Sequence, residues 1–266
     1  MNDEVNKITA TNLDLRLSEK HNKDELGALA QTFNQMLDRL EDSFDAQKMF
    51  VSNISHELRT PLAAIIAELE LALEKEYSTP YYLQTIGNAL SDSKKLVRLS
   101  DSLLDFAKAS YDPLEIVFKE VRIDEVILDA CQKLQRKNKE YKFNFIIDES
   151  IEEDTMLAMK ANPYLLEVAV SNVLENACKY SDDHQCTITI SKVDHKLSVT
   201  FKDNGFGISS EDMQHIFEPF YRGEHKTSLE GNGIGLPLTH KIITLHKGVL
   251  SLTSIVDKGS VFTMVF

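Results

Sequence analysis

Apolar residues recur at helical spacing through the first 110 residues of the chain. Between residues 26 and 44 they stand three and four positions apart, as in a coiled coil. These positions are Leu26, Leu29, Phe33, Met36, Leu37, Leu40 and Phe44. The same spacing continues through Val51, Ile54, Leu58, Leu62, Ile65 and Leu69. Pro80 and the residues just before it interrupt the pattern, and a second long helix is predicted to run to about Ala109.

The second helix carries a row of apolar residues seven positions apart. Its members are Leu83, Leu90, Val97 and Leu104, with a mostly small companion row of Ile86, Ser93, Ser100 and Ala107. Two long antiparallel helices with such stripes cannot bury both stripes in a monomer. We therefore predict an all-α helical hairpin that forms a homodimeric four-helix bundle.

After Asp112-Pro113 the pattern changes to short alternating runs mixed with helices, as in an α+β domain. The predicted strands are Ile116–Val121, Lys142–Asp148, Thr187–Lys192, Lys196–Lys202, Val249–Thr253 and Ser260–Phe266. The predicted helices are Ile123–Lys137, Pro163–Tyr180 and Pro237–His246. Because few strands alternate with helices, a doubly wound parallel sheet is disfavoured.

Composition narrows the possible functions. The net charge of the 266 residues is −13, which argues against a nucleic-acid-binding surface. The cysteines Cys131, Cys178 and Cys186 lack metal-type spacing and are expected to be reduced thiols. We find no apolar run of 18 residues and no signal-peptide pattern, so this chain is expected to be soluble.

The region around residue 56 has a polar stripe beside its apolar one. If residues 50–62 are helical, His56 faces solvent, where it could act as a nucleophile. Glu57 could accept a hydrogen bond from one ring nitrogen, and Thr60 lies one turn away, close enough to position a water. Pro61 predicts a bend directly after this turn. Pattern alone leaves open a solvated turn without chemistry.

Three segments could together form a nucleotide site, although no P-loop motif is present. On the helix 163–180, Asn172, Asn176 and Lys179 share a face, and an amide oxygen suits Mg²⁺. Asp203 follows an alternating strand, where a buried carboxylate could accept a hydrogen bond from adenine. The glycines of 231–235 precede a helix, whose N-terminus suits a triphosphate. Each segment alone also fits a role without nucleotide, as a plain turn or as asparagines that form hydrogen bonds with the neighbouring backbone.

Residues 55–62, Ser-His-Glu-Leu-Arg-Thr-Pro-Leu, resemble the H-box of bacterial sensor histidine kinases. The resemblance implies that His56 is the phosphoacceptor and that Glu57 is the assisting base. It also implies that Thr60 serves dephosphorylation of a partner response regulator.

Further downstream, residues 172–181, 203–207, the phenylalanine-rich segment 217–222 and residues 231–236 resemble, in order, the four nucleotide boxes of the same family. The resemblance implies a Bergerat-type (GHKL) α/β sandwich that binds ATP and Mg²⁺, with a mobile lid over roughly 218–234. Asn176 would bind Mg²⁺, Asp203 would bind adenine, and Lys179, Tyr180 and Arg222 would contact ribose and phosphates. The implied nucleotide-binding set is Asn172, Asn176, Lys179, Tyr180, Asp203, Gly205, Gly207, Phe217, Phe220, Arg222, Gly231, Gly233, Gly235 and Leu236. Pro237 departs from the small residue common at its position, but the first helical turn tolerates proline.

Residues 24–27, Asp-Glu-Leu-Gly, and the later Phe33-Asn34, Met36-Leu37 and Leu40 look like the second helix of a HAMP signal-transfer module, whose first helix is mostly missing. The predicted domains are therefore a partial HAMP helix (1–45), a dimerisation and phosphotransfer domain (46–111) and an ATP-binding domain (112–266). The chain is expected to be the cytoplasmic portion of a larger receptor anchored in the inner membrane. Its expected partners are a second copy of itself and the receiver domain of a response regulator.

Three other functions compete with this one. An ATPase or chaperone of the Bergerat superfamily would share the nucleotide segments but has no reason to carry the H-box. A non-enzymatic dimeric scaffold predicts loss of His56, Asn176 or Asp203, and all three are present. A protein-serine kinase on the same fold is disfavoured by the complete H-box.

Overall fold

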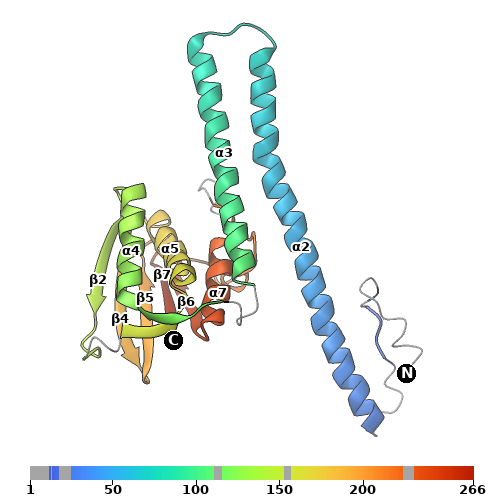
Figure 1. Cartoon of the computed structure of the whole chain (residues 1–266), viewed down its shortest axis with the longest axis vertical. Helices are drawn as coiled ribbons and strands as arrows, with labels where there is room; N and C mark the ends of the chain where they lie inside the picture. Colours follow the sequence, from blue (N-terminus) through green and yellow to red (C-terminus); the bar gives the residue numbers. More distant parts are fainter. Residues whose placement is uncertain (1–11, 13, 18–24, 111–115, 153–156, 224–230) are drawn as a thin grey trace. The chain divides into compact units, whose positions relative to one another are not determined.

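A computed structural model describes residues 12, 14–17, 25–110, 116–152, 157–223 and 231–266. The chain divides into two compact units, Met1–Glu76 and Tyr77–Phe266. Two long helices followed by an α/β domain, the predicted fold class, are present (Figure 1). None of the helices in the described part of the chain is long and apolar enough to cross a membrane.

The first unit is built on helix α2 (Glu25–Leu73), which contains Pro61. The helix runs through the proline without interruption, and the predicted bend stays a prediction. Position 24 and the side chain of Leu26, which belong to the predicted HAMP and coiled-coil patterns, lie outside what the structure describes.

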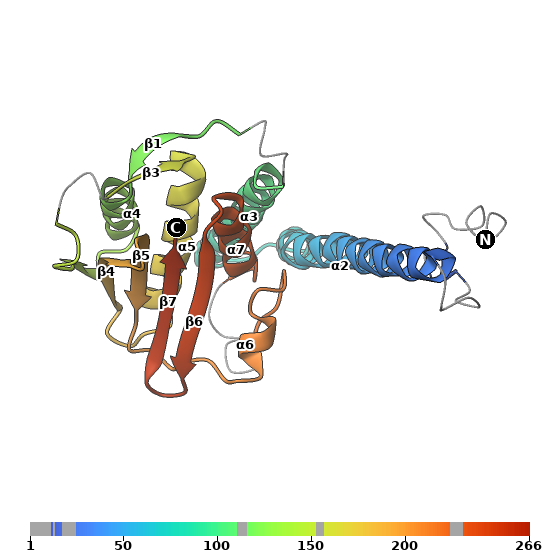
Figure 2. The same ribbon diagram turned by 90° about the horizontal axis from the view of Figure 1, so that it is seen from below.

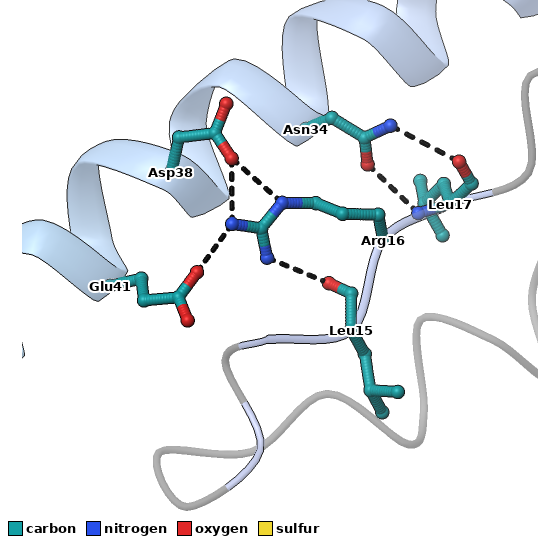
Figure 3. A network of polar contacts seen from close by, with 6 residues as sticks. All are labelled: Leu15, Arg16, Leu17, Asn34, Asp38 and Glu41. Carbon is teal, nitrogen blue, oxygen red and sulfur yellow. Dashed lines mark hydrogen bonds and ion pairs between the residues drawn. The ribbon is translucent and has the colours of Figure 1, made fainter.

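An extended segment, residues 14–17, is held against α2 by polar contacts (Figure 3). The amide of Asn34 accepts a hydrogen bond from the Leu17 N–H at 2.8 Å and donates to the Leu17 carbonyl at 3.1 Å. The guanidinium of Arg16 lies 2.6 Å from Asp38 and 2.5 Å from Glu41. The Leu17 side chain is 3% exposed. This buried side chain and the polar contacts of Arg16 and Leu17 together fix the short segment on α2.

The second unit begins with helix α3 (Thr79–Lys108) and continues into the α/β domain. Its strands are β1 (Lys119–Arg122), β2 (Lys142–Ile147), β3 (Ala158–Ala161), β4 (Gln185–Val193), β5 (Lys196–Lys202), β6 (Val249–Ile255) and β7 (Gly259–Val265). Its helices after α3 are α4 (Ile123–Lys137), α5 (Pro163–Lys179), α6 (Asp212–His215) and α7 (Gly235–Leu245).

Two short elements, β3 and α6, were not predicted, and β1 starts three residues later than predicted. The reason is the pairing of β1 with β3, which extends only from Lys119↔Ala161 to Arg122↔Ala158. Residues 116–118 have no strand partner there, so they stay irregular.

The main sheet has the order β2-β4-β5-β7-β6 and is mixed. Only β2 and β4 run parallel, and the other three pairs are antiparallel. This confirms that the domain is not doubly wound. Helices α4, α5 and α7 cover one face of the sheet (Figure 2), and strand β4 presents Cys186, Ile188 and Ile190 to them at 0% exposure. The alternate residues of β4 are partly exposed on the other face.

The end of α3 contacts the α/β domain within the second unit. The Tyr164 hydroxyl at the start of α5 donates to Asp105 Oδ1 at 2.7 Å. Nζ of Lys241 on α7 lies 4.7 Å from the centre of the Phe106 ring. Ala109, just after α3, is 4% exposed, so the helix end is partly covered by the domain that follows.

Candidate nucleotide and phosphoacceptor sites

Helix α5 provides the polar face around which the predicted nucleotide segments gather. Its N-cap Asn162 accepts a hydrogen bond from the Leu165 N–H at 3.0 Å, and Pro163 occupies the first turn. The opposite face is fully buried through Leu166, Ala169, Val170, Val173 and Leu174. Asn172, Asn176 and Lys179 are only partly buried, as the spacing predicts.

Asp203 lies directly after β5 and is 5% exposed. Its Oδ1 accepts hydrogen bonds from the backbone N–H groups of Gly205 at 2.8 Å and Ser260 at 3.1 Å. Two backbone donors therefore fix the orientation of this carboxylate. Sequence reasoning missed Ser260, although Gly259, with φ +91°, marks the tight turn that brings it there.

The two glycines after Asp203 allow its loop to pack closely on its neighbours. A Cβ on Gly205 would lie 2.0 Å from the carbonyl oxygen of Tyr180, at the end of α5. A Cβ on Gly207, where φ is +69°, would lie 2.1 Å from the carbonyl oxygen of Ile255. Because any side chain would collide with backbone at both positions, the loop geometry requires glycine.

The glycine-rich segment 231–235 lies along the polar face of α5. A Cβ on Gly231 would lie 3.0 Å from Nζ of Lys179. The Asn172 amide donates to the carbonyl of Gly235 at 3.2 Å, at the start of α7. Leu236 follows in the first turn of that helix. The backbone of this segment is thus close to the Asn172 and Lys179 side chains.

The predicted phenylalanine-rich segment contacts the glycine-rich segment and α7. The N–H of Phe220, where φ is +69°, donates to the carbonyl of Gly233 at 2.8 Å. The ring of Phe217 lies 5.2 Å from that of His240 on α7. Arg222 is exposed, and residues 224–230 of the predicted lid lie outside the described residues.

Lys179 and Tyr180 form a pair at the end of α5. Nζ of Lys179 donates to the Tyr180 hydroxyl at 3.3 Å and lies 4.7 Å from the centre of its ring. The cation is thereby positioned beside Gly231, on the face that also presents Asn176. The structure therefore places the asparagine helix, the Asp203 loop and the glycine-rich segment close together.

The surroundings of Asn176 fit a magnesium ion that arrives with phosphates. In the described part of the chain no group of three His, Cys, Asp or Glu side chains could hold a metal. A single neutral amide oxygen suits Mg²⁺ that keeps several waters and takes phosphate oxygens as further ligands. Asn176 would supply this oxygen, and the neighbouring Lys179 would add positive charge.

His56 lies on α2 in the first unit and is exposed. The Thr60 hydroxyl donates to the His56 carbonyl at 3.2 Å, one turn along the helix. No hydrogen bond between the Glu57 carboxylate and the His56 ring is found within the described residues, so the role of Glu57 as the assisting base stays a prediction. Two positions of the predicted buried stripe, Val51 and Leu62, are 56% and 50% exposed in the single chain.

Three known protein families match the chain in order. Residues 1–42 match the HAMP domain, and residues 46–111 match the His Kinase A phosphoacceptor domain. Residues 161–266 match the histidine kinase-, DNA gyrase B- and HSP90-like ATPases. The HAMP match ends before α2 does, and the ATPase match begins at the end of β3.

Individual relatives agree with these domains. The chain is 29% identical over 249 residues to the signal transduction histidine-protein kinase ArlS of Staphylococcus aureus, covering 92% of this chain and 54% of the relative. The chain thus spans about half the length of the curated relatives it matches.

Solved structures share the fold. One is histidine kinase ThkA in complex with response regulator protein TrrA, with a TM-score of 0.65, 21% identity, and coverage of 85% of this chain and 63% of that one. Another is Acinetobacter baumannii histidine kinase AdeS, with a TM-score of 0.60, 19% identity, and coverage of 79% and 96%. With its HAMP, phosphoacceptor and ATPase domains in this order, the chain belongs to the sensor histidine kinases of two-component systems.

Proposed function

We propose that this chain binds ATP in its C-terminal domain and transfers the γ-phosphoryl group to His56. The observation that carries the proposal is the convergence of the Asp203 loop and the glycine-rich segment on helix α5, in a chain that also exposes His56. The orientation of Asp203, fixed by two backbone N–H groups, supports its role as the adenine acceptor.

In the transfer, a neutral ring nitrogen of His56 attacks the γ-phosphorus. The bond from phosphorus to the bridging oxygen breaks, and ADP leaves with that electron pair. The imidazolium formed then gives its N–H proton to a base, the role we assign to Glu57. Asn176 would hold a Mg²⁺ ion that would neutralise charge on the phosphates, and Lys179 and Arg222 would bind these phosphates.

The phosphoryl group is then passed to an aspartate on the receiver domain of a response regulator. The crystallised complex of ThkA with TrrA supports a partner of this class. We assign Thr60 to the reverse reaction, dephosphorylation of that regulator. Because its hydroxyl donates to the His56 carbonyl, its lone pairs can accept a hydrogen bond from a water beside residue 56.

The proposed assembly is a homodimer in a larger membrane-anchored protein, with predicted domain boundaries after residues 45 and 111. Exposed leucines and a valine at seven-residue spacing along α3 support the dimer. Leu83, Leu90, Val97 and Leu104 are 65%, 54%, 60% and 56% exposed in one copy. The HAMP match and the similarity to ArlS support the membrane anchor.

The decisive experiment uses γ-labelled ATP with two variants. His56→Gln should abolish acid-labile labelling while nucleotide binding stays at the parent level. Asp203→Ala should abolish both. Persistent labelling of His56→Gln would refute the phosphoacceptor assignment. ATP hydrolysis without any phosphohistidine in the parent chain would favour the Bergerat ATPase, and absence of nucleotide binding would favour the scaffold.

A further inference from the structure

The chain neighbours of Arg222, Tyr221 and Gly223, both lie against the carboxylate of Asp212. On one side, the Tyr221 hydroxyl donates to Asp212 Oδ1 at 2.7 Å. On the other side, a Cβ added to Gly223 would lie 2.9–3.0 Å from the Asp212 carboxylate atoms. The Tyr221 side chain and the Gly223 backbone, on either side of Arg222, therefore both lie against one acidic side chain.

Asp212 is itself held in a defined place. Its backbone N–H donates to the Ser209 hydroxyl at 3.0 Å, and its carbonyl accepts from the Ile216 N–H at 3.0 Å, which closes the short helix α6. The hydrogen bond to Asp212 raises the pKa of Tyr221 to about 12, so the phenol stays protonated and remains a donor near neutral pH.

The chain just before Tyr221 is fixed as well. Phe220 donates its N–H to the carbonyl of Gly233, and a Cβ on Gly233 would lie 2.7 Å from Phe220 backbone atoms. Arg222 thus follows a backbone anchored to the glycine-rich segment, which in turn lies beside Lys179.

We propose that Asp212 and Tyr221 are positioning residues for Arg222, holding its backbone so that the guanidinium reaches the phosphates of ATP. This inference rests on the proposed function, because it takes from it the role of Arg222. A free guanidinium on an unrestrained loop would lose conformational entropy on binding, and the two anchors reduce that cost in advance. Neither residue needs to touch the nucleotide.

The test measures the affinity of the full chain for ATP and the KM and kcat of autophosphorylation. Tyr221→Phe and Asp212→Ala should each weaken ATP binding about tenfold, as expected for a lost hydrogen bond to a charged group. KM should rise by the same factor and kcat should change less. Asp212→Asn keeps an acceptor oxygen for the tyrosine and should restore most of the affinity.

A double-mutant cycle separates positioning from a general structural effect. In an Arg222→Ala background, Tyr221→Phe should cause no further loss of ATP affinity, because the two residues act as a unit. Independent, additive losses would overturn the inference. If Arg222→Ala alone leaves ATP affinity unchanged, the proposed role of Arg222 in phosphate binding is refuted. This result differs from additive losses, which would refute only the positioning by Asp212 and Tyr221.

Tyr164→Phe is the matched control. It removes a tyrosine hydroxyl that also donates to an aspartate at 2.7 Å, but at the contact between α3 and α5. Its ATP affinity should equal that of the parent, and a loss as large as that of Tyr221→Phe would overturn the inference. Circular dichroism checks the fold of every variant, and if Tyr221→Phe does not fold, the Asp212→Ala and Asp212→Asn pair carries the test.

Discussion

The backbone N–H of Asn162 donates a hydrogen bond to Nε2 of His246 at 3.0 Å. Nδ1 of the same ring lies 2.7 Å from the carbonyl oxygen of Ile242, so the ring carries its proton on Nδ1 and accepts at Nε2. The Asn162 side chain donates to the carbonyl of Val117, and the Phe118 ring lies 5.1 Å from the imidazole. One neutral histidine therefore joins the end of α7, the start of α5 and the segment leading into β1.

Protonation of His246 should destabilise the second unit. Burial lowers the pKa of His246, whereas the unfolded chain has a value of about 6.5. Between these two values the unfolded state binds more protons than the folded state, so the free energy of unfolding falls as the pH drops below about 6.5. Above about pH 6.5 the neutral His246 ring makes its full contribution to the free energy of unfolding. Urea unfolding at a series of pH values measures it.

His246→Gln should reduce this pH dependence, because the variant cannot be protonated at this position. His195→Asn is the control, since it removes an exposed histidine from a turn where φ is +64° and asparagine tolerates that backbone. An unchanged pH dependence in His246→Gln would contradict the role of the buried ring.

The three cysteine thiols should be unreactive in the folded protein. Cys131, Cys178 and Cys186 are all buried, and burial raises the pKa of Cys131 and of Cys178 to about 12. Since the thiolate is the reactive form, Ellman's reagent at pH 8 should label none of them until denaturant is added. Labelling at the denatured rate without denaturant would contradict this prediction.

The raised pKa values of these thiols also predict that the free energy of unfolding falls in alkali. From about pH 8.5 upward the unfolded chain releases thiol protons that the folded chain retains, so the free energy of unfolding falls as the pH rises. Cys131→Ala should show a smaller alkaline loss than the parent in unfolding curves measured between pH 8 and 10. An equal loss would assign the effect to other groups.

Gly205→Ala should abolish nucleotide binding. The added Cβ would lie 2.0 Å from the Tyr180 carbonyl oxygen, so the Asp203 loop must move, at a cost on the order of 2 kcal/mol or more. Calorimetric titration with ATP and thermal unfolding measure the two effects. Gly87→Ala on α3 is the control, because among the described residues no atom beyond its chain neighbours and the adjacent backbone of its own helix lies within 4 Å of its Cβ position. It should leave ATP binding intact.

Leu90→Lys should convert the proposed dimer into a monomer. The leucine is 54% exposed in one copy and lies in the centre of the α3 stripe, where a buried ammonium would be strongly unfavourable. Light scattering coupled to gel filtration gives the molar mass. Gln84→Lys adds the same charge at an exposed position outside the stripe and should stay dimeric. A monomeric parent chain would contradict the dimer itself.

The sequence predicts those parts of the fold that repeat along the chain. The alternation through Cys186, Ile188 and Ile190 identifies β4, and helical spacing identifies α5 with its polar face. Strand β3 escaped prediction because its four residues, Ala158–Ala161, are defined by pairing with β1, some forty residues earlier.

The candidate site likewise combines features that follow from local sequence patterns with contacts that form only on folding. Asp203, Gly205 and Gly207 could be predicted from the sequence because a strand end and a tight turn lie next to each other in the chain. The contacts of Asp203 with Ser260 and of Tyr221 with Asp212 join residues that no spacing rule connects. Only the folded chain brings them together, and for that reason sequence analysis missed Ser260 and Asp212.

Strand β7 lies between β5 and β6, although it is the last strand of the chain. During synthesis on the ribosome, β5 therefore has an unpaired edge until residues 259–265 have emerged. Hydrogen bonding across the centre of the sheet must then wait until translation has passed the whole domain. Chains stalled before β7 would present an open strand edge prone to aggregation and would be natural substrates for chaperones.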